Sequence, residues 1–296
     1  MPFISFLDYL NLEKNYSKHT LIAYHKDLEG FREFASLEFD FSEINNVSYA
    51  IIRSWIVKLV GDGVSNRTIN RKISSLRTYY KFLLKIGDIE VSPLVKHKVL
   101  KTTKKLQVPF SEKEIEDVLE ILKGENSFLG LRNKLIVELF YSTGMRRGEL
   151  VNLKLNDISD SQKTIKVLGK RNKERIIPLL PSALNTIASY LDYRKSLSSI
   201  KDVHYLLLTK KGAKIYETLV YRVINNYFSK ASEKVKKSPH ILRHSFATHL
   251  LNEGADIKSV KELLGHSSLA STQIYANNSI SKLKQVYKNA HPRNSK

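Results

Sequence analysis

Three short segments in the second half of the chain combine residue types that suit attack on a phosphate diester. They are STGMRRGEL at residues 142–150, SPHILRHSFATHLL at 238–251 and LLGHSSLASTQIY at 263–275. Each sets an arginine or a histidine beside a glycine or proline, the residues that mark helix ends. A diester under attack gains negative charge, and two arginines with paired N–H donors can hold that charge without a metal ion.

The first candidates for holding the phosphate are two arginines and a histidine. Arg146 follows the helix-ending Gly144, so we expect its guanidinium to project from a turn. A salt bridge to Glu149, three residues on, is the alternative use of this side chain. His240 and Arg243 are spaced i, i+3 at a helix start marked by proline, where backbone N–H groups also favour an anion.

Tyr275 is the candidate nucleophile. A free phenol has a pKa of about 10, so it needs a base or a strong positive field to attack at neutral pH. The chain has 15 tyrosines, and a tyrosine more often fills the edge of a core. Tyr275 stands out because it follows Gly265 and His266 by one short helix, in a region rich in phosphate-binding signals.

Metal chemistry is the alternative reading of the histidines. His240 and His244 have the i, i+4 spacing of a metal pair, but no glutamate lies between them and no nearby carboxylate or thiolate offers a third ligand. We therefore expect no metal and no cofactor, and we expect His244 and His249 to be hydrogen-bonded helix residues. Cysteine is absent, which excludes disulfides and thiolate nucleophiles and fits a reducing cytoplasm.

The pattern of apolar residues predicts a mainly α fold in two domains. The first hundred residues, with a helix expected from Ser17, show no sustained period-2 alternation, so the N-terminal domain is predicted to be all-helical. The basic, proline-ended segment that follows is a linker. Our boundaries are residues 1–98, a linker at 99–109, and a second domain at 110–296.

The second domain is predicted to be α+β with a small antiparallel sheet. Ser111 and Glu114 form a capping box before a helix at 111–123, and a second helix is expected at 129–143. The runs TIKVL and ERIIPL, divided by GKRNK, predict a hairpin between residues 157 and 178. Helices are expected from there to the C-terminus.

The charge of the chain points to a nucleic-acid partner. It carries 49 Lys and Arg against 29 Asp and Glu, a formal net charge of +20, and residues 101–296 hold +17 of it. A generally basic or ribosome-associated protein is the alternative. No apolar run reaches the roughly 18 residues of a membrane span, so we expect a soluble cytoplasmic protein with no membrane partner.

The stretch 65–85 has two contrasting helical faces. Placed 100° apart, its apolar residues share one side: Ile69, Ile73, Leu76, Tyr80 and Leu83. The opposite side carries only cations and hydroxyls, at Arg67, Arg71, Ser74, Thr78, Lys81 and Lys85. A solvated face normally mixes charge signs, and this helix contains no acid, so we predict contact with DNA phosphates.

Taken together, the motifs resemble those of the Xer branch of the tyrosine recombinases, relatives of the phage integrases. FLDYLNLEKNYSKHTLIAYHKDLEGF and SNRTINRKISSLRTYYKFLL resemble the helical core-binding domain of that family. TGMRRGELVNLKLNDI, VLGKRNKERIIPL, SPHILRHSFATHLL and LLGHSSLASTQIY resemble its catalytic motifs, in the same order, so the resemblance covers essentially the whole chain. It implies a catalytic set at Arg146, Lys170, His240, Arg243, His266 and Tyr275.

The resemblance also implies a mechanism without ATP. Arg146 and Arg243 would clamp the scissile phosphate while Tyr275 attacks it, which leaves a 3′-phosphotyrosyl link and a free 5′-hydroxyl. The diester energy is kept in that link for rejoining.

The remaining members of the set would move protons or hydrogen-bond the phosphate. Lys170 would protonate the departing 5′-oxygen, although Lys173 lies on the same loop and could reach it instead. His240 would move the tyrosine proton or orient its neighbours, and His266 would hydrogen-bond a non-bridging oxygen.

The sequence departs from the family pattern at three positions. Gly148 stands where the family usually has Ser, and Ala276 and Asn277 stand where Thr and His are common. None belongs to the catalytic set. The resemblance further implies that a helix at about 281–289 is donated to a neighbouring protomer, in a homo- or hetero-tetramer on two double-stranded DNA sites. A second recombinase and control by a septal DNA translocase are left open.

Other functions compete with the Xer role, which is chromosome or plasmid dimer resolution for segregation at cell division. A mobile-element integrase or DNA invertase would use the same chemistry, but arm-binding integrases carry an extra N-terminal domain, whereas this chain begins with core-binding helices. A DNA-binding protein without catalysis would not need the six residues. A type IB topoisomerase would share the phosphotyrosyl chemistry without needing a particular site.

Overall fold

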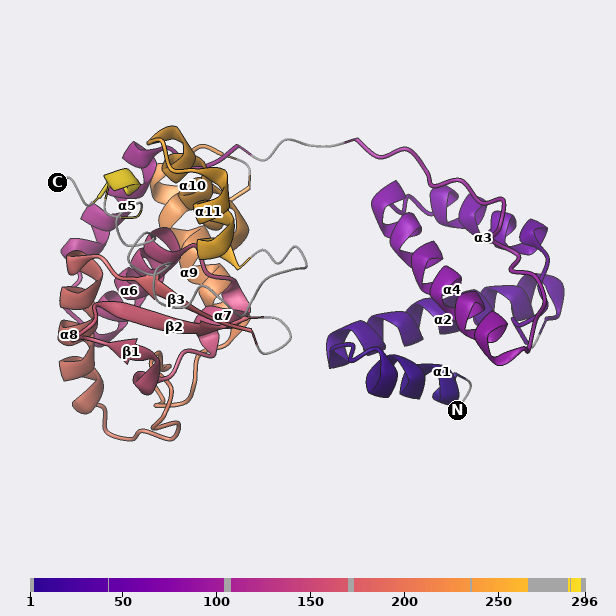
Figure 1. Ribbon diagram of the computed structural model, residues 1–296, viewed down its shortest axis with the longest axis horizontal. Coiled ribbons are helices and arrows are strands. Elements are labelled where there is room, and N and C mark those ends of the chain that lie inside the picture. The colour runs from indigo at the N-terminus through magenta and orange to yellow at the C-terminus, as the bar shows by residue number, and fades with distance from the viewer. Residues whose placement is uncertain are drawn as a thin grey trace. The chain divides into compact units, whose positions relative to one another are not determined.

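The computed structural model divides into two compact units, Met1–Lys105 and Leu106–Lys296 (Figure 1). It describes residues 3–41, 43–103, 108–169, 173–234, 236–265, 287 and 289–293. Each unit has its own cluster of buried apolar side chains. Among the helices in these ranges, none has the length and apolar character needed to span a membrane.

The first unit is helical, as predicted. Its elements are α1 (Ile4–Asp8), a π turn η1 (Tyr9–Glu13), α2 (Lys18–Phe39), α3 (Tyr49–Gly61) and α4 (Asn66–Ile86). Ser17 and Ser65 cap α2 and α4, because their hydroxyls accept hydrogen bonds from backbone N–H groups three residues on. The predicted helix from Ser17 is therefore confirmed.

Helix α4 has the two faces that its sequence predicts. The apolar residues at 69, 73, 76, 80 and 83 are all buried in the core of the unit. Of the polar face, Arg67, Arg71, Ser74 and Lys81 are exposed, and Thr78 is partly exposed. The amphipathic pattern is confirmed, and it leaves a cationic strip on the surface.

The start of the expected linker is held against α4. The Asn70 side chain donates to the Leu100 carbonyl at 2.9 Å and accepts from the Leu100 N–H at 3.0 Å, as a neighbouring strand would. Asn66 adds a bond to the Lys101 carbonyl at 2.8 Å. We expected residues 99–109 to be a linker, and its first residues are thus fixed to the first unit.

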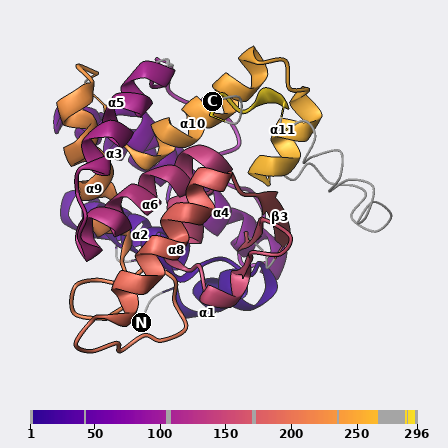
Figure 2. The ribbon, with the colours of Figure 1, turned by 90° about the vertical axis from the view of Figure 1, so that its left-hand side faces the viewer.

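The second unit combines helices with one small sheet. Its helices are α5 (Glu112–Lys123), α6 (Phe128–Thr143), α7 (Arg147–Val151), α8 (Pro181–Lys195), α9 (Glu217–Ala231), α10 (Pro239–Asn252) and α11 (Ile257–Leu264), with a 3-10 turn η2 (Leu155–Asp157). The capping box of Ser111 and Glu114 is present at the start of α5. Figure 2 shows α8 along the outside of this unit, with α10 and α11 near one another.

The sheet contains the predicted hairpin and one further strand. Strands β2 (Thr164–Leu168) and β3 (Glu174–Pro178) pair antiparallel, with Ile165 opposite Ile177. The short strand β1 (Ile158–Ser159), which we did not predict, pairs with β2 in the order β1-β2-β3. The predicted fold class, a helical domain followed by an α+β domain with a small antiparallel sheet, is confirmed.

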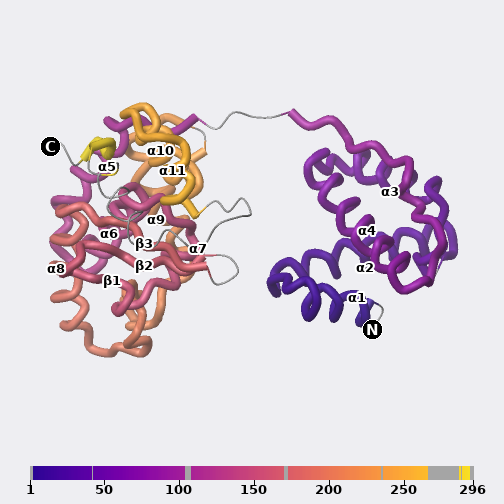
Figure 3. Tube along the Cα trace, viewed as in Figure 1, coloured from indigo at the N-terminus to yellow at the C-terminus, as the bar shows by residue number. Residues whose placement is uncertain are grey.

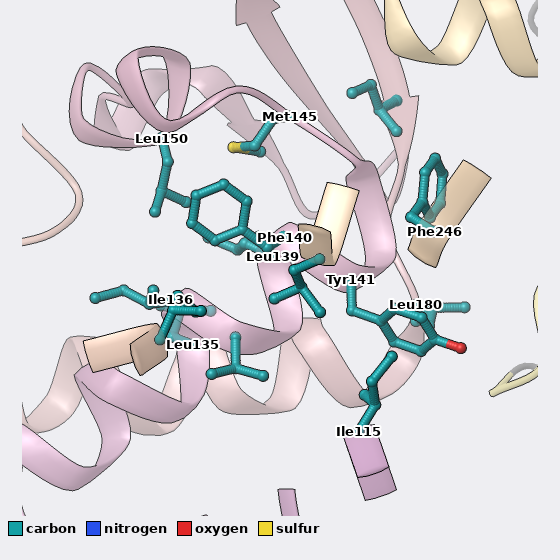
Figure 4. Close-up of a cluster of buried hydrophobic side chains, with 14 of the residues drawn as sticks. Ile115, Leu135, Ile136, Leu139, Phe140, Tyr141, Met145, Leu150, Leu180 and Phe246 are labelled. Carbon is teal, nitrogen blue, oxygen red and sulfur yellow. The ribbon is translucent and has the colours of Figure 1, made fainter. Parts of the chain in front are cut away.

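Helix α6 forms the centre of the second core. Figure 4 shows Leu139, Phe140 and Tyr141 from this helix among other buried side chains, including Met145 and Phe246. Gly144 ends α6 with a left-handed φ of 58°. A Cβ at this position would lie 2.3 Å from Phe246, so both the backbone and the packing require glycine. The turn at Gly144 leads directly to Arg146, the N-cap residue of the next helix.

The last described residues cap the end of α6. The hydroxyl of Tyr287 donates to the Ser142 carbonyl at 2.6 Å, and Nε2 of His291 lies 3.1 Å from the Tyr141 carbonyl. Carbonyls in the last turn of a helix lack partners within the helix, so these bonds satisfy them. Burial lowers the pKa of His291 to about 4, which keeps the ring neutral. Of the expected exchange helix at about 281–289, only residues 287 and 289 are described.

Candidate active site

Arg146 both projects from a turn and forms a salt bridge with Glu149, the two alternatives that its sequence position suggested. It is the N-cap residue of α7, with extended backbone, and its side chain is 38% exposed. Its backbone N–H donates to Oε2 of Glu149 at 2.7 Å, and its Nη1 donates to Oε1 at 2.8 Å. Its Nη2 lies 3.4 Å from the Gly265 carbonyl. The turn therefore presents a guanidinium that is oriented by one carboxylate and still partly open to solvent.

Arg243 reaches the same place from α10. Its side chain is buried, its Nη1 donates to the Gly144 carbonyl, and its Nη2 donates to the Leu264 carbonyl at 2.7 Å. Burial and the nearby charge of Arg146 lower the pKa of Arg243 to about 10. Two guanidiniums thus meet where α6 ends and α11 ends, and two like charges held together favour an anion between or beside them.

His240 lies in the first turn of α10, exposed and close to several cations. Its pKa is lowered mainly because the ring is partly shielded from water, and further by the positive charges of Arg147 and Arg243. The ring is therefore neutral at pH 7 and able to accept a proton. Further along α10, His249 is buried with its Nδ1 3.0 Å from the Tyr141 hydroxyl, which confirms our expectation for that residue. His244 is exposed, and within the described ranges no three His, Asp or Glu side chains gather as metal ligands.

Two site residues escaped the sequence reasoning in whole or in part. Glu149 was named only as a partner of Arg146, and Arg175 on β3 was not named as a site residue. Arg175 donates from Nη1 and Nη2 to the two carboxylate oxygens of Glu149, at 3.0 and 2.7 Å, and from Nε to the Leu263 carbonyl at 2.9 Å. We call Arg146, Glu149 and Arg175 the Glu149 cluster.

A signal for Arg175 was present in the strand pattern. Arg175 and Ile177 stand two apart on β3 and share a face of the strand, and Ile177 is buried. A cation on the inward face of a strand needs a buried partner. Burial alone would raise the pKa of Glu149, but hydrogen bonds from Arg175 and from the Arg146 backbone bring it below its ordinary value. The carboxylate is therefore ionised at neutral pH.

Three members of the implied catalytic set, Lys170, His266 and Tyr275, lie outside the described residues. The structure describes the residues that flank them, Gly169 and Lys173 on either side of Lys170, and Gly265 before His266. The Gly169 N–H donates to the Lys173 carbonyl at 2.8 Å, at the end of the β2–β3 hairpin that lies beside α7 in Figure 3. Gly265 ends α11 with a φ of 63°, one residue before His266.

A second buried carboxylate lies against the cationic face of α4. Asp27 on α2 is buried and accepts from both Nη atoms of Arg71, at 2.5 and 2.9 Å, from Ser75 at 2.8 Å and from Lys72 at 3.3 Å. We call these four residues the Asp27 cluster. The guanidinium of Arg71 thus makes a paired contact with a carboxylate, and its side chain remains 51% exposed.

The α+β unit brings two arginines together where they can hold a phosphate diester under attack, which fits an enzyme that breaks and rejoins DNA. The comparison with protein families agrees. Residues 3–87 match the N-terminal SAM-like domain of the phage integrases, and residues 109–282 match the phage integrase family. The chain belongs to the phage integrase family and is a tyrosine recombinase.

Individual relatives are similar over almost the whole chain. The tyrosine recombinase XerC of Staphylococcus haemolyticus is 39% identical over 293 residues, which cover 99% of this chain and 97% of the relative. The XerC of Oceanobacillus iheyensis is 38% identical, with 98% and 95% covered. The fold is similar to that of the XerH recombinase in a post-cleavage complex with its difH substrate, with a TM-score of 0.72, 23% identity, and 95% and 79% of the two chains covered.

Proposed function

We propose that the chain is a Xer-type recombinase that cuts DNA at a specific site through Tyr275 and resolves chromosome or plasmid dimers. The observation that carries the proposal is the meeting of Arg146 and Arg243 at the end of α11. Arg243 binds the Leu264 carbonyl and Arg146 contacts that of Gly265. The segment that contains Tyr275 begins at the next residue.

The chemistry follows from the charges of these groups. Arg146 and Arg243 hold the non-bridging oxygens of the scissile phosphate, which gain charge as the phenolic oxygen of Tyr275 attacks. Neutral His240 accepts the phenolic proton or orients its neighbours. The bond from phosphorus to the tyrosine oxygen forms and the bond to the 5′-oxygen breaks, so a 3′-phosphotyrosyl link replaces the diester.

Lys170 and His266 complete the step. Lys170 gives a proton to the departing 5′-oxygen, and His266 donates a hydrogen bond to a non-bridging oxygen. Rejoining is the same step in reverse, with the 5′-hydroxyl of the partner strand as nucleophile. Because the new link keeps the diester energy, the reaction runs without ATP.

Assembly on DNA is part of the proposal. Residues 1–98 clamp the duplex with the cationic face of α4, residues 99–109 link the domains, and residues 110–296 cut the strand. XerH has been solved bound to its palindromic difH substrate, and lambda integrase has been solved as a dimer bound to a core site and as a tetramer bound to a Holliday junction. We propose four protomers on two sites, joined by the C-terminal helix, with a second recombinase and a septal translocase as further partners.

The decisive test is capture of the covalent intermediate. A duplex carrying the recombination site, selected by binding from a random-sequence pool and nicked next to the cleavage position, releases a short fragment after cleavage and so prevents rejoining. We expect a denaturant-resistant adduct through a 3′-phosphate, lost in Tyr275→Phe. An adduct that persists in this variant, or that forms through a 5′-phosphate, would contradict the proposal.

The general acid can be assigned with a second substrate. We expect Lys170→Ala to slow cleavage strongly and Lys173→Ala to slow it little. Replacing the bridging 5′-oxygen by sulfur makes a leaving group that needs no proton, so this substrate should restore cleavage by Lys170→Ala. If sulfur rescued Lys173→Ala instead, the roles of the two lysines would be reversed.

A further inference from the structure

The end of α11 collects three arginines on three successive carbonyl groups. Leu263 accepts from Arg175, Leu264 accepts from Arg243, and Gly265 lies within reach of Arg146. The C-terminal end of a helix carries partial negative charge, so it is a favourable place for guanidinium groups. Arg146 and Arg243 have a proposed role at the phosphate, whereas Arg175 has none.

Arg175 is largely shielded from solvent, and its guanidinium is hydrogen-bonded to two elements, α7 and α11. Its side chain is only 11% exposed. Two of its nitrogen atoms bind Glu149 and the third binds α11. A Cβ at Gly265 would lie 3.1 Å from Arg175 atoms, so the two residues are closely packed. Arg175 therefore ties strand β3, which follows Lys170 in the sequence, to the end of α11, where Gly265 precedes His266.

The charge of Glu149 decides what Arg146 can do. A carboxylate offers about four lone-pair positions, and those of Glu149 accept the backbone N–H and Nη1 of Arg146 together with Nη1 and Nη2 of Arg175. Because Arg175 offsets the negative charge, Arg146 keeps a net positive field for an anion. Without Arg175, the same carboxylate would neutralise Arg146 and repel a phosphate.

We propose that Arg175 is a positioning residue for strand cleavage, which sets the charge and place of Arg146 and fixes the end of α11. The proposal rests on the proposed function, because it assumes that Arg146 and Arg243 hold the scissile phosphate. Arg175 itself makes no contact with DNA. It therefore controls the rate of cleavage and leaves DNA affinity nearly unchanged.

The test compares Arg175→Met with the same substitution at a buried arginine elsewhere. Arg194 on α8 is buried, as Arg175 mostly is, and donates to the carbonyls of Val203 and Tyr205, at 2.8 and 3.1 Å. Both variants lose a buried guanidinium that binds backbone carbonyls, so Arg194→Met serves as the control for lost stability. Cleavage is measured in single turnover on the nicked duplex at saturating protein, below the unfolding temperature of both variants.

We expect Arg175→Met to cleave about 10- to 100-fold more slowly, because small misplacements of a phosphate-binding group have effects of this size. Arg194→Met should cleave at the wild-type rate. Affinity, measured by fluorescence anisotropy with Tyr275→Phe added to each protein, should stay within about threefold, since Arg175 makes no phosphate contact. Arg175→Lys should lie between the methionine variant and the wild type, because lysine restores the charge but not the paired contacts.

A double variant distinguishes the electrostatic effect of Arg175 on Glu149 from the effect of its packing. Adding Glu149→Gln to Arg175→Met removes the negative charge that Arg175 offsets, so cleavage should recover in part. Wild-type cleavage by Arg175→Met, or equal losses in the two methionine variants, would overturn the inference. If the wild-type protein itself formed no adduct at Tyr275, the proposed function would fail instead, so the two failures are distinguishable.

Discussion

The two units contain buried carboxylates that hold arginines in different ways. In the Asp27 cluster, both Nη atoms of the half-exposed Arg71 lie on the carboxylate. In the Glu149 cluster, the paired contact belongs to the mostly buried Arg175, and the more exposed Arg146 makes a single side-chain contact with the carboxylate. The first arrangement holds the exposed arginine by two contacts to one carboxylate, whereas the second holds Arg146 by one contact to the carboxylate and a longer one, of 3.4 Å, to the Gly265 carbonyl.

This difference matches two kinds of work on DNA. A backbone contact needs a cation held in one place, because it sets register and orientation. A group at a reacting phosphate needs unsatisfied donors aimed where charge develops. We therefore infer that the Asp27 cluster serves binding and that the Glu149 cluster serves the chemical step.

The largest effect should come from Arg146→Gln. Loss of one guanidinium from the reacting phosphate should lower the single-turnover cleavage rate by about 10²- to 10³-fold. Affinity for uncleaved duplex should fall by no more than the loss of one phosphate contact. Arg71→Gln is the matched control, since at saturating protein it should cleave near the wild-type rate. Equal losses of cleavage in both variants would break the distinction between the clusters.

Asp27→Asn should affect the stability of the first unit. The substitution weakens the contacts of Arg71 and Lys72 and disturbs the buried Ser75 hydroxyl, at a cost of about 1–3 kcal/mol. Hydrogen exchange on the full chain can measure this, as lower protection of amides in α2 and α4 with little change in α6. Unchanged protection in α4 would mean that the carboxylate does not hold the helix pair.

The structural features that the sequence could predict are those whose interacting residues lie close together in the chain. The faces of α4 and the capping box at Ser111 follow from spacings of three and four residues, so the sequence indicated both. The hairpin followed from its β-branched runs. By contrast, β1 has only two residues, too few for an alternating pattern.

Pairs between distant elements could not be found in this way. Arg71 and Asp27 are 44 residues apart, and Arg175 and Glu149 are 26 apart. Helical spacing placed Arg71 on an exposed face but contained no information about the element opposite. The proposed catalytic residues stand in sequence motifs and were named from the sequence, whereas the contact of Arg175 with Glu149, the carboxylate that also holds Arg146, required the tertiary structure.

A smaller effect is expected from Arg71→Gln on binding. A lost phosphate contact should weaken affinity for all sequences alike and reduce the slope of log K against log salt by about one. Anisotropy titrations from low to moderate salt give this slope. Lys58 on α3, which pairs with Glu38 on the exposed surface of the same unit and lies outside the cationic face of α4, offers a comparison, and Lys58→Gln should change the slope less. A slope unchanged in Arg71→Gln would remove this residue from the DNA-binding face.

The smallest effect should come from Gly148→Ser, which introduces the residue usual in the family beside Glu149. A Cβ at Gly148 would lie 3.3 Å from Oε1 of Glu217, a side chain that is half exposed and able to shift. Serine gains about 0.5 kcal/mol over glycine in a helix, so the free energy of unfolding should change by less than about 0.5 kcal/mol in either direction. Cleavage should stay near the wild-type rate because the Glu149 cluster is untouched. A loss of cleavage beyond tenfold would show that the ion pair between Glu217 and Arg147 also affects the position of Arg146. The Glu149 cluster would then not be the sole control of Arg146 among the described residues.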